Sequence, residues 1–151
     1  MLFRSLSLNE QSGLLGVSGV SADLRQVLSA ADAGDSRAEL ARDMFVHSLV
    51  KGVGAMVAVL NGLDALVFTG GIGEHSPVIR ALTCIAFGYL DLTLDPARNE
   101  SDPVDIDIAA PASAVRVLVL TAREDLAILR QVKRVLGWTS VGRLSEIESP
   151  S

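Results

Sequence analysis

The stretch LDALVFTGGIGEHSPVIR, residues 63–80, decides the fold class of this chain. Its first part, 64–69, is a short apolar run that predicts a buried strand, and the spacing from Glu74 or Ser76 to about Phe87 predicts a helix. Three glycines in four positions, 70–73, join the two. The stretch therefore predicts a strand that turns directly into a helix, an arrangement typical of α/β proteins.

The glycine turn has two interpretations that the residues alone leave open. Glycines at the end of a strand leave several amides unobstructed by Cβ atoms beside the positive end of a helix dipole, and phosphate-binding sites use that arrangement. The turn lacks the Gly-Lys-Ser/Thr of a Walker loop, and Gly71-Ile72-Gly73 lacks the third glycine of the dinucleotide fingerprint. A nucleotide site and a plain strand-to-helix turn therefore remain alternatives.

Two helices are predicted on the N-terminal side of this stretch. Ser21 is suited to an N-cap with Asp23 in the first turn, where a carboxylate complements the helix dipole, and this helix runs to about Ala31. The sequence SRAE (36–39) fits a capping box. The helix that it opens is apolar on most of its surface as far as Leu60, so we expect it to be buried on most sides.

The remaining segments complete an α/β order. The apolar run 115–120 predicts a second buried strand, and 123–136 predicts an amphipathic helix with acidic residues in its first turn and basic residues near its end. Three further segments are predicted outside these elements: GLLGVSG (13–19) as a loop, 89–94 as a short strand, and LDPARN (94–99) as a turn.

Composition narrows the possible partners. The 151 residues are 49% hydrophobic, which is enough for one ordinary domain and its core. The net charge of -5 argues against binding nucleic acid or an anionic membrane, because either polyanion would be repelled. The longest uncharged apolar stretch, Gly52 to Leu63, is shorter than the roughly 20 residues that span a bilayer. These features predict a cytoplasmic protein with a small-molecule or protein partner.

Two single residues are given structural interpretations. Cys84 is the only cysteine and has no nearby ligand pattern, so it is predicted to be a buried thiol rather than a metal ligand or nucleophile. Asn99 begins a match to the glycosylation sequon, which we interpret as chance because residues 1–11 lack the apolar region of a secretory signal.

Taken together, four segments resemble the C-terminal part of the acetate kinase family, in the family's order and with similar spacing. The resemblance implies a ribonuclease-H-like α/β domain of the actin and Hsp70 type, with an incomplete sheet flanked by helices. It also implies that 1–137 is the nucleotide-binding portion; from the residues themselves, we expect 138–151 to be a disordered tail. The four segments are SGLLGVSGVSADLR (12–25), LDALVFTGGIGEHSPVIR (63–80), LDPARN (94–99) and VRVLVLTAREDLAI (115–128).

The resemblance implies a site that binds ATP with Mg²⁺ and takes part in reversible phosphoryl transfer to acetate. Glu124 matches the family's magnesium-associated glutamate, although Thr121 to Glu124 is also an acceptable capping box. His75 stands where the family usually has asparagine, and its charge varies with pH. The nucleotide-contact segments match Asp23, Leu24 and Arg25, and then Gly71, Ile72, Gly73, Glu74 and His75.

The family's chain is well over twice as long as this one, and its N-terminal part carries the acetate pocket and the catalytic residues. No catalytic residue is therefore assigned here, and we expect ATP or ADP as partners, with acetate or acetyl phosphate only if the other half is supplied. The family also implies a homodimer. The alternatives are a propionate or butyrate kinase part, a non-catalytic nucleotide-binding or dimerisation module, and a remnant that does not fold.

Overall fold

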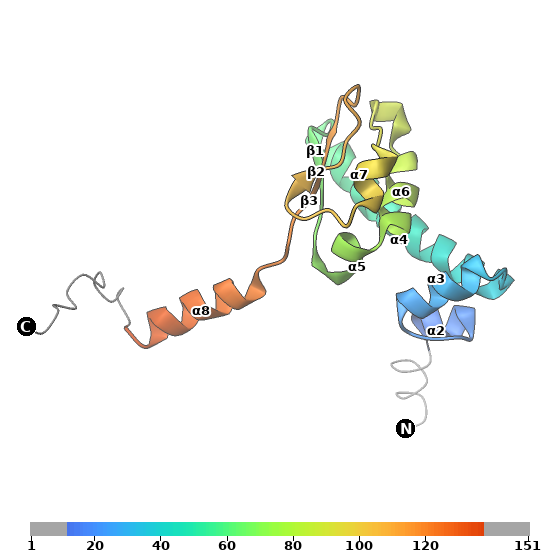
Figure 1. The fold of residues 1–151 in the computed structure, drawn as a ribbon, viewed down its shortest axis with the longest axis horizontal. Helices are drawn as coiled ribbons and strands as arrows, with labels where there is room; N and C mark the ends of the chain where they lie inside the picture. Colours follow the sequence, from blue (N-terminus) through green and yellow to red (C-terminus); the bar gives the residue numbers. More distant parts are fainter. Residues whose placement is uncertain (1–11, 138–151) are drawn as a thin grey trace, which may run out of the picture. The chain divides into compact units, whose positions relative to one another are not determined.

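The computed structural model describes residues 12–137, and the chain divides after Leu120 into two compact units (Figure 1). The disordered tail expected over 138–151 lies outside the described residues. The first unit contains α2 (Gly13–Ser18), α3 (Leu24–Asp32), α4 (Ser36–Leu60), β1 (Ala65–Phe68), α5 (Gly70–His75), α6 (Pro77–Ile85), η1 (Gly88–Leu90), α7 (Pro96–Glu100), β2 (Ile106–Asp107) and β3 (Arg116–Val119). The described part of the second unit contains α8 (Glu124–Val135).

Three short strands form one sheet in the order β1-β3-β2. β1 and β3 run parallel, with Ala65 opposite Arg116 and Phe68 opposite Val119, whereas β2 runs antiparallel to β3. Both strands predicted from apolar runs are confirmed within one residue at each end. The small sheet with helices packed around it confirms the expected mixed α/β class.

Two hydrophobic cores lie along α4, one at each half of the helix. Figure 1 shows α2 and α3 beside one half of α4 and the sheet near the other. At the N-terminal half, Ala38 and Ala41 pack with Val27 and Ala31 of α3, and small residues at this contact allow the two helices to approach closely. At the C-terminal half, Val57 joins the core of the sheet. That second core also contains Leu66, Phe68, Cys84, Phe87, Leu92, Ile108, Ala109, Val115, Val117 and Val119.

The expectation that α4 is buried on most sides is wrong for the described structure. Only three of its residues are buried, Ala38, Ala41 and Val57, because α2, α3, α6 and the small sheet cover part of its surface. Large apolar side chains such as Met56 (56% exposed) and Val59 (77% exposed) face outward. By length and composition α4 is apolar enough to cross a membrane, a test that core helices of soluble proteins also pass.

Aspartates, not the serines chosen from the sequence, cap the first two of the predicted helices. Asp23 is the N-cap of α3 and accepts a hydrogen bond of 2.9 Å from the Arg25 amide, so the prediction of Ser21 as cap is wrong by two residues. Asp35 caps α4 in place of Ser36. Its carboxylate accepts bonds of 2.9 and 3.0 Å from two amides of the first turn, which leaves no need for the predicted capping box.

Three short segments also differ from their predictions. The predicted loop 13–19 is helix α2, which ends at Gly19 with a left-handed φ of 70°. The predicted strand 89–94 contributes the end of η1 and one isolated bridge; its alternate leucines do face the core, but from irregular backbone. The predicted turn 94–99 contains all but the last residue of α7, because Pro96 at the first helical position is compatible with a helix start.

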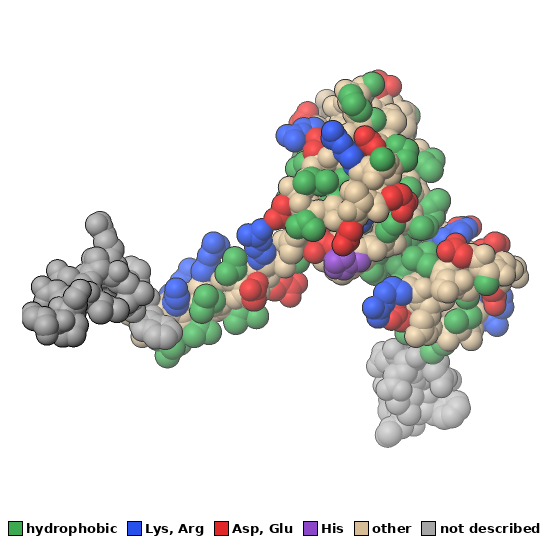
Figure 2. All heavy atoms as spheres, viewed as in Figure 1, with side chains coloured by type: hydrophobic (Ala, Val, Ile, Leu, Met, Phe, Trp, Pro, Cys, Tyr) green, Lys and Arg blue, Asp and Glu red, His purple; other side chains and the backbone are tan. Residues whose placement is uncertain are grey.

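Helix α8 confirms the helix predicted over 123–136. Its first turn holds Glu124 and Asp125, and its last turn holds Lys133 and Arg134, so both ends complement the helix dipole. No residue of α8 is buried, and Figure 2 shows hydrophobic side chains along it between acidic and basic ones. Within the described part of the second unit, therefore, nothing buries the apolar side chains of α8.

Cys84 lies in the core of the sheet, as predicted, with 3% of its surface exposed. Burial raises the pKa of its thiol to about 12, although the cation of Arg80 opposes the shift. The thiol is therefore uncharged at neutral pH.

Candidate functional site

The glycine segment, residues 69–75, connects the C-terminal end of β1 to α6 through the short helix α5. Thr69 takes the N-cap position with extended backbone, and Ser76 serves both as the C-cap of α5 and as the N-cap of α6. The Ser76 hydroxyl accepts a hydrogen bond of 3.4 Å from the Ile79 amide. The predicted strand and helix are thus present, but the turn between them is itself helical.

The three glycines of this segment have different surroundings. Gly70 has a φ of 74°, a left-handed conformation that side chains rarely adopt. A Cβ on Gly73 would lie 3.3 Å from the carbonyl carbon of Phe68, so the segment packs tightly against the end of β1. Gly71 is exposed, and a Cβ there would meet nothing within 4 Å. A plain turn accounts for Gly70 and Gly73 but gives no reason for Gly71.

The side chains that follow the glycines have distinct roles. The Glu74 carboxylate accepts a hydrogen bond of 2.7 Å from the Gly70 amide and so closes the segment on itself. His75 is 70% exposed, and its Nδ1 lies 3.9 Å from a carboxylate oxygen of Asp102. Ile72 is 42% exposed. The surface of the segment therefore combines open backbone with an imidazole and an apolar side chain.

Arg80 supports the segment and was given no role by sequence reasoning. The residue is 1% exposed, and its Nη1 donates to the carbonyl oxygens of Gly73 and Glu74 at 2.9 and 2.7 Å. Its Nε donates to Oδ1 of Asn99 at 2.8 Å. The buried positions of α6 recur at helical spacing, and Arg80 is one of them. An arginine at a position where the spacing predicts a buried side chain is the signal that could have identified this role from the sequence.

Asp23, Leu24 and Arg25 lie together at the start of α3. Arg25 donates to both carboxylate oxygens of Asp23, with a shortest distance of 2.6 Å, and these hydrogen bonds hold the pKa of Asp23 below its usual value. The Arg25 side chain is 89% exposed beside an open hollow of about 560 Å³. Leu24 is buried, so any ligand contact there would come from its backbone.

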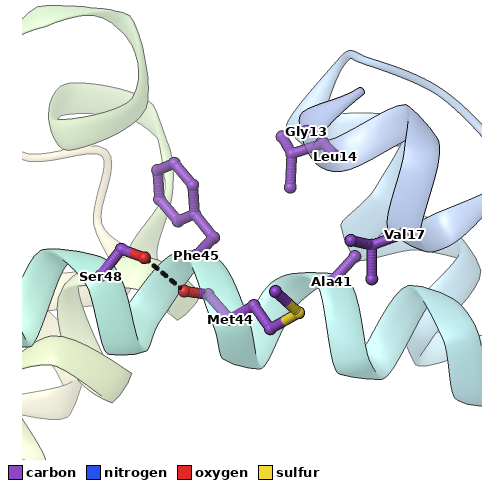
Figure 3. Close-up of a pocket in the computed structure, with 7 residues that line it drawn as sticks. All are labelled: Gly13, Leu14, Val17, Ala41, Met44, Phe45 and Ser48. Carbon is purple, nitrogen blue, oxygen red and sulfur yellow. Dashed lines mark hydrogen bonds between the residues drawn. The ribbon is translucent and has the colours of Figure 1, made fainter. Parts of the chain in front are cut away.

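A second hollow, of about 400 Å³, lies between α2 and α4 (Figure 3). Leu14, Val17, Met44 and Phe45 give it an apolar lining. Its one hydroxyl, on Ser48, donates to the carbonyl of Met44 at 2.9 Å. The hollow has no cation among its lining residues and therefore does not suit a phosphate group.

Glu124 is the first residue of α8 and is exposed, in the second unit. The predicted capping box is wrong, because Arg123 occupies the N-cap and makes no side-chain capping bond. Over residues 12–137, no cluster of three or more histidine, cysteine, aspartate or glutamate side chains is arranged to hold a metal. Glu124 is thus available as a single carboxylate.

Comparison with known proteins gives a consistent result. Residues 5–130 match the model of the acetokinase family. The chain is 57% identical over 129 residues to the acetate kinase of Trichormus variabilis, covering 85% of this chain and 32% of that protein. It is similar to the crystal structure of Porphyromonas gingivalis acetate kinase, with a TM-score of 0.77, 38% identity and coverage of 87% of this chain and 33% of that one. A propionate kinase from Francisella tularensis matches with a TM-score of 0.74, 38% identity and coverage of 85% and 32%. The chain therefore spans about a third of the length of the relatives that it matches.

Proposed function

This chain belongs to the acetokinase family, and we propose that it forms the nucleotide-binding C-terminal part of an acetate kinase, which transfers the γ-phosphoryl group of ATP reversibly to acetate. One observation carries the proposal beyond family membership. Gly71 has neither the left-handed backbone nor the close packing of its neighbours, yet it keeps the segment free of a side chain. A ligand that approaches the backbone closely accounts for that glycine.

We infer that two segments contact the nucleotide. Gly71, Ile72, Gly73, Glu74 and His75 would present open backbone to adenosine and phosphate, as glycine-rich turns at strand ends do. Arg25 would supply a planar cation that can stack on a base or donate to a phosphate, because its side chain is 89% exposed even while it is bonded to Asp23. Asp23 would then orient Arg25, and Leu24 would contribute backbone only.

Mg²⁺ is expected to bind together with ATP, and Glu124 is the residue proposed to contact it. Mg²⁺ in kinases is usually held by one or two carboxylates, waters and the phosphates of the substrate. A single exposed carboxylate fits that mode, in which no complete protein cage is needed. When bound, the metal would neutralise charge on the phosphates during transfer.

Catalysis is proposed to need the rest of the family's chain. Phosphoryl transfer depends on positioning and charge stabilisation around the whole reacting group, so a part that binds only the nucleotide should not turn over acetate or acetyl phosphate alone. The Porphyromonas gingivalis acetate kinase and the Francisella tularensis propionate kinase are each 38% identical to this chain, so these two identities do not distinguish acetate from propionate. The acyl preference is assigned here to that other part. A cytoplasmic location and a homodimer that covers exposed apolar residues of α4 complete the proposal.

The test is a thermal melt of the purified chain with and without Mg·ATP. A ligand that binds only the folded state adds about 2.7 kcal/mol to stability at 100 times its dissociation constant, which raises the melting temperature by several degrees. Gly71→Ala should abolish most of that rise without lowering the melting temperature of the free protein, because its methyl group meets only open space.

Gly52→Ala is the matched control, since Gly52 is also open on an exposed helical surface but lies in α4. It should keep the full response to Mg·ATP. The same response in both variants, or none in the unaltered chain, would exclude the glycine segment as the nucleotide site. Acetyl phosphate synthesis by this chain alone would contradict the proposed division of labour, and sedimentation in the presence of ATP would report the dimer.

A further inference from the structure

The guanidinium group of Arg80 is buried where α5 and α7 both end. Its Nη1 donates to the carbonyl oxygens of Gly73 and Glu74, and its Nη2 donates at 2.7 Å to that of Asn99. These carbonyls belong to the last turns of short helices, where no later amide of the same helix is available. One cation therefore satisfies the C-terminal ends of two helices, which is the end where the helix dipole favours positive charge.

Asn99 completes this arrangement from α7. Its Oδ1 accepts from Nε of Arg80 at 2.8 Å, and its Nδ2 donates at 3.0 Å to the carbonyl oxygen of Pro77 in the first turn of α6. Asn99 is only 3% exposed, so the asparagine of the sequon match is not accessible. Loss of any one bond would leave a buried polar group unsatisfied, and the pair is therefore rigid.

The partners of Arg80 are unusual for a buried cation. Within the described part of the chain it makes no ion pair, and three of its four hydrogen bonds go to backbone carbonyls. Burial lowers its pKa, while the carboxylates of Glu100 and Asp102 oppose the shift from outside hydrogen-bond range. A side chain bonded in this way fixes backbone, and two of the three carbonyls belong to the glycine segment.

We propose that Arg80 and Asn99 are positioning residues for the nucleotide, which hold the glycine segment in its binding shape before the ligand arrives. The inference rests on the proposed nucleotide site at residues 71–75. Glycine-rich backbone is flexible, and a segment that the ligand had to order would lose affinity through the entropy of ordering. Arg80 prevents that loss by bonding to the carbonyl oxygens of Gly73 and Glu74, and it leaves the space around Gly71 open.

The experiment compares two substitutions at adjacent buried positions of α6. Arg80→Lys keeps a positive charge but cannot reproduce the fork of donors that reaches two helix ends. Ile79→Val shortens a side chain that is also 1% exposed and leaves every bond of Arg80 in place. Mg·ATP affinity is measured by titration calorimetry under conditions where each variant is folded, and amide hydrogen exchange is followed at residues 72–75.

Arg80→Lys should weaken ATP binding by about tenfold and speed exchange at residues 72–75, whereas Ile79→Val should change affinity by less than about twofold and leave that exchange unaltered. Asn99→Ala removes only the side-chain anchor and should give an intermediate loss; it takes the place of Arg80→Lys if that variant does not fold. Equal effects of the α6 variants would reduce Arg80 to a structural role and overturn the inference.

Failure of the unaltered chain to bind ATP would instead reject the proposed function. In that case the amide hydrogen exchange rates of the two α6 variants alone test whether Arg80 holds the glycine segment in place. Faster exchange at residues 72–75 in Arg80→Lys alone supports it, and unchanged exchange overturns it.

Discussion

Substitution of Gly73 by alanine tests whether the glycine segment packs against β1 as described. The added Cβ would lie 3.3, 3.4 and 3.5 Å from the carbonyl carbon, Cβ and Cα of Phe68. Two of these three atoms belong to the backbone of a strand whose register is fixed by pairing with β3. Phe68 therefore cannot turn aside as a flexible side chain would, and either β1 or α5 must shift.

The size of the effect follows from two opposing contributions. Forcing an extra methyl group into a packed contact costs about 1–3 kcal/mol. Replacing glycine by alanine in a helix returns about 0.5–1 kcal/mol. With the middle of each range, the net loss in unfolding free energy is about 1.25 kcal/mol, or roughly 5 °C in melting temperature at about 4 °C per kcal/mol for a unit of this size.

Gly71→Ala is the control that separates the effect of the close contact from the effect of helix propensity. It has the same helix-propensity gain without the contact, so its melting temperature should stay level or rise by up to about 4 °C. Thermal and urea unfolding followed by circular dichroism measure both variants. The packing argument is refuted if Gly73→Ala is as stable as the unaltered chain, or if Gly71→Ala loses as much stability.

Two further predictions concern buried groups of α6. Burial raises the pKa of the Cys84 thiol from 9.0 to about 12, so the unfolded chain loses this proton first and the free energy of unfolding should fall as pH rises from about 9 to about 12. In urea melts across that pH range, Cys84→Ala should flatten the fall. An identical pH dependence in Cys84→Ala and the unaltered chain would show that the thiol is not buried in solution. The Thr83 hydroxyl is buried without a hydrogen-bond partner among the described residues, so Thr83→Val should raise the unfolding free energy by about 1 kcal/mol in the same melts, and a loss of stability would mean that the hydroxyl has a partner.

The sequence predicted the elements whose signal is local and strong. The strands near 65–68 and 116–119, the long helix α4 and the charged ends of α8 follow from apolar runs, periodicity and dipole complementarity. Errors arose where a short motif had two acceptable positions. Asp35 and Ser36 can both cap a helix, and the choice depends on which side chain reaches the free amides.

The burial of α4 could not be predicted from its composition, because an apolar helix is buried only where other elements cover it. Met56 and Val59 are as apolar as Val57, yet only Val57 meets the sheet core. In the candidate site, too, the local motif could be predicted and the packing could not. The glycine segment was visible as a motif, whereas the bonds of Arg80 to Gly73 and Asn99 join residues 7 and 19 positions apart and depend on how α5, α6 and α7 meet.

The two cores along α4 also imply an order of folding for the first unit. The core at the N-terminal half draws its members from residues 14–41, whereas the sheet core draws on residues 50–119 and requires Ala65 to find Arg116. Contacts between neighbouring segments form faster, because less chain entropy is lost in closing them. Folding should therefore start at the first turns of α4 and reach the sheet last, so that the glycine segment acquires its shape only when the chain is nearly native.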